Sequence, residues 1–245
     1  MATFNDHFSG HAESYAAARP SYPMELFAWL ASLCHQRQLA LDVACGNGQA
    51  AIALSHHFTT VHAIDASAEQ IAHAKPASGV SYSVAQGEAT GLADSCVDLV
   101  TVAQALHWFD LDAFINETRR ILSPGGVLAV WCYGLFSVTP QIDAIVNELY
   151  KRHTDKWWPP ERDHIDQAYR HLIIPGQQHE RRFAMQKTWH VDQALAYLRT
   201  WSSVQRAIKA TGDDPVNLVE GRLRSLWTGP IRVQWPLTIK WSRTL

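Results

Sequence analysis

A short apolar strand that runs into a glycine-containing turn constrains the fold of this chain more than any other feature. Residues 39–43, Leu-Ala-Leu-Asp-Val, are apolar at four positions in five, which is typical of a buried strand. Gly46 and Gly48 then allow a sharp turn, and the alanine-rich residues 50–54 begin a helix. A strand, a tight turn and a helix in this order predict a nucleotide-binding α/β fold.

The same turn serves two cofactor families, and its spacing alone does not separate them. Gly46-x-Gly48-x-x-Ala51 fits the dinucleotide fingerprint, and Asp65 follows at about the distance of the acidic residue that binds a ribose hydroxyl. Asp42, just before the turn, would repel a pyrophosphate at short range. It would attract the sulfonium and ammonium groups of S-adenosylmethionine. The charge of Asp42 therefore favours the methyl donor over a dinucleotide.

Several strings along the chain resemble one enzyme family. Residues 41–49, Leu-Asp-Val-Ala-Cys-Gly-Asn-Gly-Gln, resemble the first motif of class I S-adenosylmethionine-dependent methyltransferases, acidic-x-Gly-x-Gly-x-Gly. Ala44 stands at the first glycine of that pattern, where an alanine fits if its φ is negative. Phe-x(6)-Tyr-x(3)-Arg-Pro-x-Tyr-Pro in residues 8–23 and Gln-Ala-Leu-His-Trp-Phe in residues 104–109 resemble the methyltransferase type 11, trans-aconitate methyltransferase-like subgroup.

The resemblance implies an α/β fold: a three-layer Rossmann-like sandwich with a seven-stranded, mostly parallel sheet and an antiparallel last strand. It also implies N-terminal helices and a helical cap inserted after the fifth strand. We expect residues 1–245 to form a single methyltransferase domain. Its parts are an N-terminal helical lid (1–36), a donor-binding half (37–132), a cap insertion (133–179) and C-terminal strands and helices (180–245).

The second half of the chain is less regular. Apolar spacing predicts a helix around residues 142–149 and another over 165–172, then a strand over 183–190. Helices over 191–201 and 215–226 and a last strand over 231–241 follow. Eight of the ten tryptophans lie from Trp131 onward, which aromatic core packing explains more simply than an apolar acceptor pocket.

Carried over by position, the family motifs place the donor site at the ends of neighbouring strands. Asp42 and the turn would hold the methionine end, Asp65 the ribose hydroxyls and Glu88 the adenine amino group. The expected cofactor-binding residues are Asp42, Ala44, Gly46, Asn47, Gly48, Gln49, Asp65, Ala66, Glu88, Ala89, Gln104 and Ala105.

The expected reaction moves a methyl group to a carboxylate or hydroxyl oxygen of a small or medium organic acceptor. Displacement at the methyl carbon needs alignment and desolvation rather than a protein nucleophile. His107, at a strand end that borders the ligand crevice, or Tyr15 could take a proton from a hydroxyl acceptor. A carboxylate needs no base, and Arg19 would position it. Tyr22 and Trp108 complete the expected substrate residues.

The composition of the chain limits which kinds of partner we expect it to bind. Lys and Arg total 21 against 23 Asp and Glu, a formal charge of -2 without a basic stripe, so we expect no nucleic-acid partner. No apolar run approaches membrane length, and residues 1–10 lack the apolar core of a signal peptide. Four cysteines without paired spacing favour a reducing cytoplasm, and the 13 histidines lack metal-ligand spacing. We expect a cytoplasmic monomer or homodimer that acts on a small molecule and holds no metal.

Two other classes of function remain open. An NAD(P)-dependent oxidoreductase shares the turn and Asp65, but it leaves Asp42 unexplained. A non-catalytic S-adenosylmethionine-binding protein is compatible with every donor-site residue, because donor binding and acceptor chemistry use different side chains. A lone histidine such as His107 is more often structural than catalytic.

Overall fold

The structure, a computed structural model, describes residues 20–243 of the chain. In this part of the chain, seven strands form one sheet. They are β1 (Leu39–Val43), β2 (Thr60–Asp65), β3 (Val80–Val84), β4 (Val97–Ala103), β5 (Leu122–Tyr133), β6 (His179–Trp189) and β7 (Ile231–Arg243).

The strands follow the order β3-β2-β1-β4-β5-β7-β6 across the sheet. Strands β1 to β5 are parallel to one another, β7 is antiparallel to β5, and β6 is antiparallel to β7. This topology confirms the predicted Rossmann-like fold with an antiparallel last strand. The carboxyl ends of the five parallel strands meet at one edge, where ligands bind in open α/β sheets.

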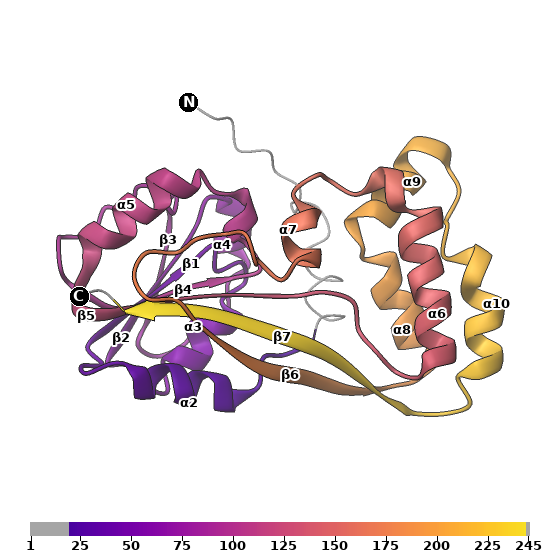
Figure 1. Ribbon diagram of the computed structural model, residues 1–245, viewed down its shortest axis with the longest axis horizontal. Helices are drawn as coiled ribbons and strands as arrows, with labels where there is room; N and C mark the ends of the chain where they lie inside the picture. Colours follow the sequence, from indigo (N-terminus) through magenta and orange to yellow (C-terminus); the bar gives the residue numbers. More distant parts are fainter. Residues whose placement is uncertain (1–19, 244–245) are drawn as a thin grey trace.

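Helices cover both faces of the sheet (Figure 1). Along β5, Val127, Ala129 and Trp131 belong to one buried cluster, whereas Leu128 and Val130 belong to the other, the alternation of a strand buried on both faces. The first cluster includes residues of α2 (Met24–Leu33) and α3 (Gln49–Leu54) and contacts α4 (Ala68–Ala72); the second includes residues of α5 (Leu111–Ile121) and α7 (Arg162–Asp166).

A second group of helices forms a separate lobe at the far end of the molecule, and long strands connect it to the sheet (Figure 1). Strand β7 pairs with β5 only from Leu237 onward, so its residues 231–236 project beyond the parallel sheet together with residues 184–189 of β6. Trp189 and Trp235 pack edge to face there, with ring centroids 4.9 Å apart. The lobe consists of α6 (Pro140–Glu148), η2 (Leu149–His153), η3 (Asp155–Trp157), α8 (Val191–Arg199), α9 (Ser202–Thr211) and α10 (Asn217–Leu226).

Three local predictions differ from the structure. The helix expected over 165–172 ends at Asp166, because Ala168 and Tyr169 adopt left-handed φ angles of 49° and 58°. Helix α9 was not predicted, and it begins directly after Trp201, the expected end of the preceding helix. Strand β6 begins at His179 rather than residue 183.

Core packing, the predicted role, accounts for five of the eight tryptophans from Trp131 onward. Those buried in the core are Trp131, Trp189, Trp201, Trp227 and Trp235, each with at most 8% of its surface exposed. Between residues 20 and 243, no helix is both long and apolar enough to cross a membrane.

Candidate active site

Asp42 lies at the centre of the strand edge, inside the protein. Its side chain is 0% exposed, and Thr101 on β4 donates its hydroxyl to Asp42 Oδ1 at 2.8 Å. Asp42 Oδ2 is buried and has no hydrogen bond of good geometry, although the nearby backbone N–H of Ala51 in the first turn of α3 favours the charged carboxylate. Burial raises the pKa of Asp42 to about 7, and the Asp65 carboxylate adds to the rise. A positive charge at this edge would relieve an unfavourable buried charge.

Asp65 closes the turn from the neighbouring strand. Its Oδ2 accepts a hydrogen bond from Gly46 N at 2.8 Å, and its Oδ1 accepts one from Ser67 N at 2.9 Å. The side chain of Ser67 in turn caps α4 by accepting from Gln70 N. The sequence separates Asp42 and Asp65 by 23 positions, yet the fold places both carboxylates at one short stretch of strand edge. The expected Ala66 lies between Asp65 and Ser67 and is partly exposed.

The turn has a left-handed backbone at Ala44, and a neighbouring side chain packs closely against Gly48. Ala44 has a φ of 54°, so the condition under which an alanine fits easily here, a negative φ, is not met; the alanine adopts the conformation that the family's glycine would favour. Gly48 has a φ of 87°, and a Cβ there would lie 2.2 Å from Tyr82 Oη. The ring of Tyr82 on β3 therefore occupies the space beside Gly48, a contact that the sequence did not indicate.

Gln49 joins the turn to the segment that precedes α2. Its Oε1 accepts from Tyr22 N at 3.3 Å, and its Nε2 donates to the carbonyl of Pro20 at 3.4 Å. The ring of Tyr22 packs against Trp131 at 5.6 Å between centroids. The carbonyl of Asn47 accepts from Lys75 N at 3.2 Å, which fixes the backbone of the turn. Tyr15 and Arg19 lie outside the described residues.

The segment after β3 folds back over the end of β1. A Cβ on Gly87 would lie 2.8 Å from Val43 Cγ1, so only a glycine allows this close approach. Glu88, which follows, accepts from Asp110 N at 3.0 Å and so joins this segment to the start of α5. Ala89 is exposed and donates its N–H to the carbonyl of Gln86.

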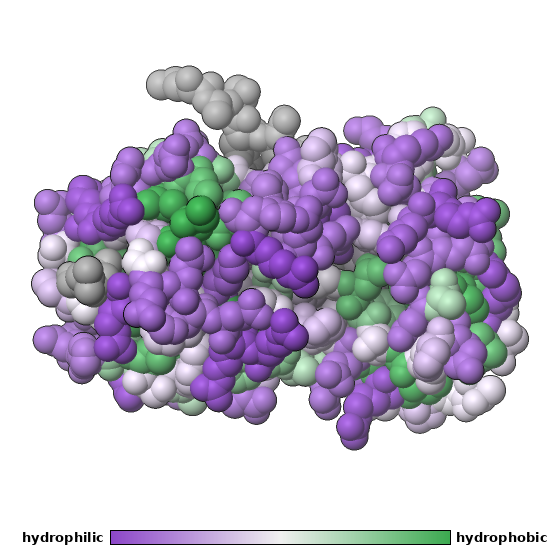
Figure 2. All heavy atoms as spheres, in the orientation of Figure 1, coloured by the Kyte–Doolittle hydropathy of each residue, from purple (hydrophilic) through white to green (hydrophobic). Residues whose placement is uncertain are grey.

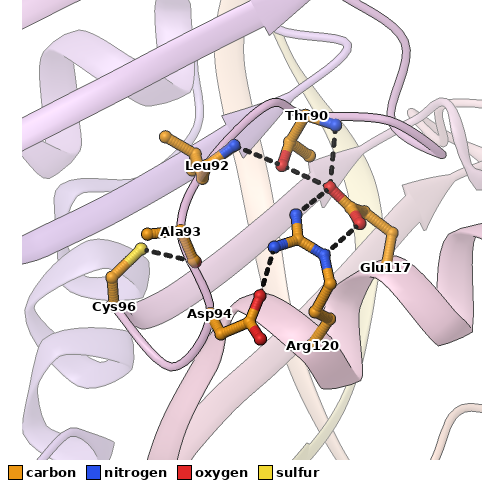
Figure 3. A network of polar contacts seen from close by, with 7 residues as sticks. All are labelled: Thr90, Leu92, Ala93, Asp94, Cys96, Glu117 and Arg120. Carbon is orange, nitrogen blue, oxygen red and sulfur yellow. Dashed lines mark hydrogen bonds and ion pairs between the residues drawn. The ribbon is translucent and has the colours of Figure 1, made fainter.

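An ion-pair network then holds the rest of this loop against α5 (Figure 3). Glu117 Oε1 accepts from Thr90 N at 2.8 Å and from Thr90 Oγ1 at 2.6 Å. Arg120 donates to both oxygens of Glu117 and reaches Asp94 Oδ1 at 2.6 Å. Hydrogen bonds from Arg120, with help from Thr90, lower the pKa of Glu117 to about 2. The network anchors the loop that carries Glu88 and Ala89.

The end of β4 carries the remaining expected residues. The side-chain amide of Gln104 donates to Tyr133 O at 2.9 Å and accepts from Tyr133 N at 2.8 Å, so it extends the pairing of β4 with β5. Ala105 is buried at the start of the short helix η1 (Leu106–Trp108). His107 Nδ1 lies 2.9 Å from Tyr169 Oη, and its ring centroid lies 4.6 Å from that of Trp108.

A cavity of about 340 Å³ opens between the sheet, α7 and the helical lobe. Figure 2 shows apolar surface at several places on a largely hydrophilic face, and one of them is where the two lobes meet. Within the cavity, Asp166 is held by Tyr150 and Arg162, whereas Lys151 forms no ion pair with any residue between 20 and 243. The cavity is lined by Cys132, Gly134, Leu135, Tyr150, Lys151, Ile165, Asp166, Ala168, Pro236 and Thr238.

This site suits a cationic nucleotide derivative. Two carboxylates share one strand edge, one of them with a buried oxygen that lacks a well-formed hydrogen bond, and the charges of both would repel a diphosphate. The sulfonium and ammonium groups of S-adenosylmethionine are positively charged, so both carboxylates would attract them. Among residues 20–243, no group of three His, Cys, Asp or Glu side chains could hold a metal ion.

Known proteins with similar sequences and structures share this architecture. Residues 41–130 match the family described as a methyltransferase domain. A Dictyostelium discoideum protein named as a methyltransferase is 35% identical over 216 residues, 86% of this chain and 82% of that protein. A solved structure from Anaeromyxobacter dehalogenans, named as a type II methyltransferase, has a TM-score of 0.87 at 42% identity and covers 92% of this chain and 97% of that one.

The fold and the relatives together define the class: this is a Rossmann-like methyltransferase. The chain belongs to the class I S-adenosylmethionine-dependent methyltransferases, and S-adenosylmethionine is its cofactor. This membership decides between the two cofactor families that the glycine turn had left open, and it excludes the nicotinamide alternative. The trans-aconitate methyltransferase-like subgroup stays a prediction.

Proposed function

We propose that this methyltransferase transfers the methyl group of S-adenosylmethionine to a carboxylate oxygen of a small or medium organic acceptor. The observation that carries the proposal is the cavity between α7 and the helical lobe: Lys151 is the cationic residue in its lining, and Lys151 forms no ion pair with a residue between 20 and 243. Such a side chain attracts an anionic acceptor. Arg19, which lies outside the described residues, is a further candidate to position the carboxylate.

The donor would occupy the acidic edge at the ends of β1 and β2, on the same sheet as the end of β5 that lines the cavity. Asp65 and Glu88 would accept hydrogen bonds from the ribose hydroxyls and the adenine amino group. The turn from Gly46 to Gly48 would give the donor close access to the backbone. Asp42 would act from beneath the turn through its charge rather than by direct contact, because its side chain is fully buried.

The main contribution of the protein to this reaction would be to align the donor and the acceptor. S-adenosylmethionine supplies the methyl group: its bond to sulfur breaks as the bond to the acceptor oxygen forms, and the electron pair stays on sulfur. Burial, with Arg162 and His164 nearby, lowers the pKa of His107 to about 3, so the ring is neutral and weakly basic at physiological pH. A weak base favours an acceptor that is already ionised, which a carboxylate is. A hydroxyl acceptor is the second candidate.

A panel of matched acceptors tests the proposal. Carboxylic acids and the alcohols of the same skeletons are incubated with methyl-labelled S-adenosylmethionine, and the products are treated with alkali. Methyl esters release labelled methanol, whereas methyl ethers do not. Label that is found only in alkali-stable products would contradict carboxylate transfer.

Lys151→Met tests the role of the cavity. We expect KM for the acid to rise roughly two- to fivefold with kcat little changed, because an exposed charge contributes up to about 1 kcal/mol. Lys156→Met is the matched control, since Lys156 stacks over Trp157 outside the cavity. Equal effects of the two substitutions would remove Lys151 from the acceptor site.

A further inference from the structure

A buried tyrosine contacts the imidazole at the end of β4. Tyr169 is 1% exposed, and its Oη lies 2.9 Å from His107 Nδ1. No other residue between 20 and 243 hydrogen-bonds the His107 ring, so Nε2 is the nitrogen left for a ligand. The phenol comes from a segment 62 positions later in the chain, and no sequence motif links the two residues.

The backbone conformation at the end of α7 directs the Tyr169 side chain toward His107. Helix α7 ends in two crossed hydrogen bonds, from Tyr169 N to His164 O and from Ala168 N to Ile165 O. This termination places Ala168 in the left-handed region where glycine is usual, and Tyr169 follows it there. Residues with side chains rarely adopt this conformation in succession. Contacts from another part of the fold are therefore needed to stabilise this backbone conformation.

Lys240 on β7 stabilises this segment through hydrogen bonds. Its ammonium group donates to the carbonyls of Tyr169 at 2.6 Å, Leu172 at 3.1 Å and Arg170 at 3.2 Å. Lys240 is only 9% exposed, so these three carbonyls replace the water that a buried ammonium loses. The sheet thereby fixes the position of Tyr169, and Tyr169 contacts His107.

The direction of the hydrogen bond follows from the surroundings of the phenol oxygen. Hydrogen bonding by the backbone of Leu106 and His107, at the start of η1, acts against the rise in the pKa of Tyr169, as N–H donors to Tyr169 Oη do. Burial raises the pKa of Tyr169 well above its ordinary value, so the phenol keeps its proton. An oxygen that accepts from backbone N–H groups has its own O–H to give, and His107 Nδ1 is the acceptor within reach.

We propose that Tyr169 is a positioning residue that holds His107 in the Nε2–H tautomer, so that the ring presents a hydrogen-bond donor, not a base, to the methyl acceptor. The part that concerns the acceptor rests on the proposed function. A carboxylate has two oxygens: one attacks the methyl carbon, and the other can accept from Nε2–H. The same donor would not remove a proton from a hydroxyl or an amine. His107 is thereby a residue that selects for anionic oxygen acceptors.

The tautomer is measured without any substrate. Long-range nitrogen–proton correlation spectra of protein labelled with nitrogen-15 histidine show which ring nitrogen carries hydrogen. We expect His107 in the free wild-type protein to carry its proton on Nε2 and not to titrate between about pH 5 and 8. In Tyr169→Phe the ring should show both tautomers. Tyr197→Phe removes another buried phenol, which accepts from Trp235 Nε1 in the helical lobe, and it should leave the His107 signals unchanged.

Two substitutions of the histidine separate a donor from a base. In His107→Gln the amide nitrogen lies near the place of Nε2 and can donate, whereas in His107→Asn it lies near the place of Nδ1. With an acid acceptor, we expect kcat/KM to stay within about threefold for Gln and to fall about tenfold for Asn, the loss of one hydrogen bond to a charged oxygen. Loss of a general base would cost about 100-fold or more in both variants.

The outcomes keep the two proposals apart. A proton on Nδ1 in the wild-type protein overturns the role of Tyr169, whatever the acceptor. An Nε2–H tautomer with equally inactive Gln and Asn variants overturns the donor role of His107. Transfer to alcohols alone, with the Nε2–H tautomer present, contradicts the proposed acceptor class and leaves the positioning by Tyr169 intact.

Discussion

Replacing Asp42 by asparagine should stabilise the free protein while it weakens binding of the donor. The substitution keeps the shape and removes the charge. A pKa of about 7 in place of the ordinary 3.8 corresponds to roughly 4 kcal/mol of unfavourable charge burial above pH 7. The amide loses part of the bond to Thr101 and meets the Ala51 N–H less well, which subtracts about 1 to 2 kcal/mol. We expect a net gain of about 2 kcal/mol at pH 8.

The sign with pH follows from the direction of the pKa change. Because folding raises the pKa of Asp42, the native protein binds more protons than the unfolded chain between about pH 4 and 7. The destabilisation is therefore absent below about pH 4, grows as the pH rises and is complete above about pH 7. The stability difference between the variant and the wild type should grow over the same range.

Donor affinity should change in the opposite sense. As Asp42 ionises between about pH 6 and 8, binding of S-adenosylmethionine to the wild-type protein should tighten, whereas in Asp42→Asn it should be weaker and flat with pH. Two unit charges about 6 to 8 Å apart at an effective dielectric constant of about 20 attract each other by roughly 2 to 3 kcal/mol, which corresponds to roughly 30- to 100-fold in Kd. Urea denaturation and calorimetric titration at several pH values measure the two effects.

Asp98 provides a matched control. It is a buried carboxylate at the opposite edge of the sheet, where it accepts from Gln38 N at 2.7 Å and Leu39 N at 3.1 Å. Asp98→Asn should lower stability and leave donor affinity unchanged. If Asp42→Asn binds S-adenosylmethionine as tightly as the wild type, or unfolds more easily at pH 8, the electrostatic role of Asp42 is refuted.

Three further substitutions have definite expected outcomes. Glu117→Gln should cost about 1.5 kcal/mol near pH 7; because folding lowers the pKa of Glu117 to about 2, the cost should vanish as the pH falls from about 4.5 to 2 in acid-denaturation curves. Ala44→Gly should raise stability by about 1 kcal/mol, since it relieves a left-handed alanine, and a lower urea midpoint would contradict this. Asp65→Ala should weaken donor binding without unfolding the protein, as calorimetry and circular dichroism would show.

The sheet was predictable from the sequence because its signals are local. A run of buried apolar residues, a turn with two glycines and an acid at the next strand end identify β1, α3 and β2 without knowledge of their neighbours. Parallel strands place their carboxyl ends at one edge, which is why Asp42 and Asp65 could be assigned to one site. The left-handed φ of Ala44 could not be predicted, since the surrounding turn rather than the residue imposes it.

The contacts that pass between distant segments were not predictable. Tyr169 reaches His107 only because α7 ends in an unusual left-handed pair, and Lys240 reaches that pair from the last strand. Gln104 is expected to line the cofactor, and the two hydrogen bonds of its amide to the Tyr133 backbone were not predicted. Each of these depends on tertiary packing that residue spacing does not encode.

The placement of the donor at the acidic strand edge is tested most directly by a crystal structure of the protein with S-adenosylhomocysteine. We predict that the ribose hydroxyls lie within hydrogen-bond distance of Asp65, that the adenine lies beside Glu88 and Ala89, and that Asp42 stays buried beneath the turn. A ligand bound away from the ends of β1 and β2, with no contact to Asp65, would contradict the assignment of the site.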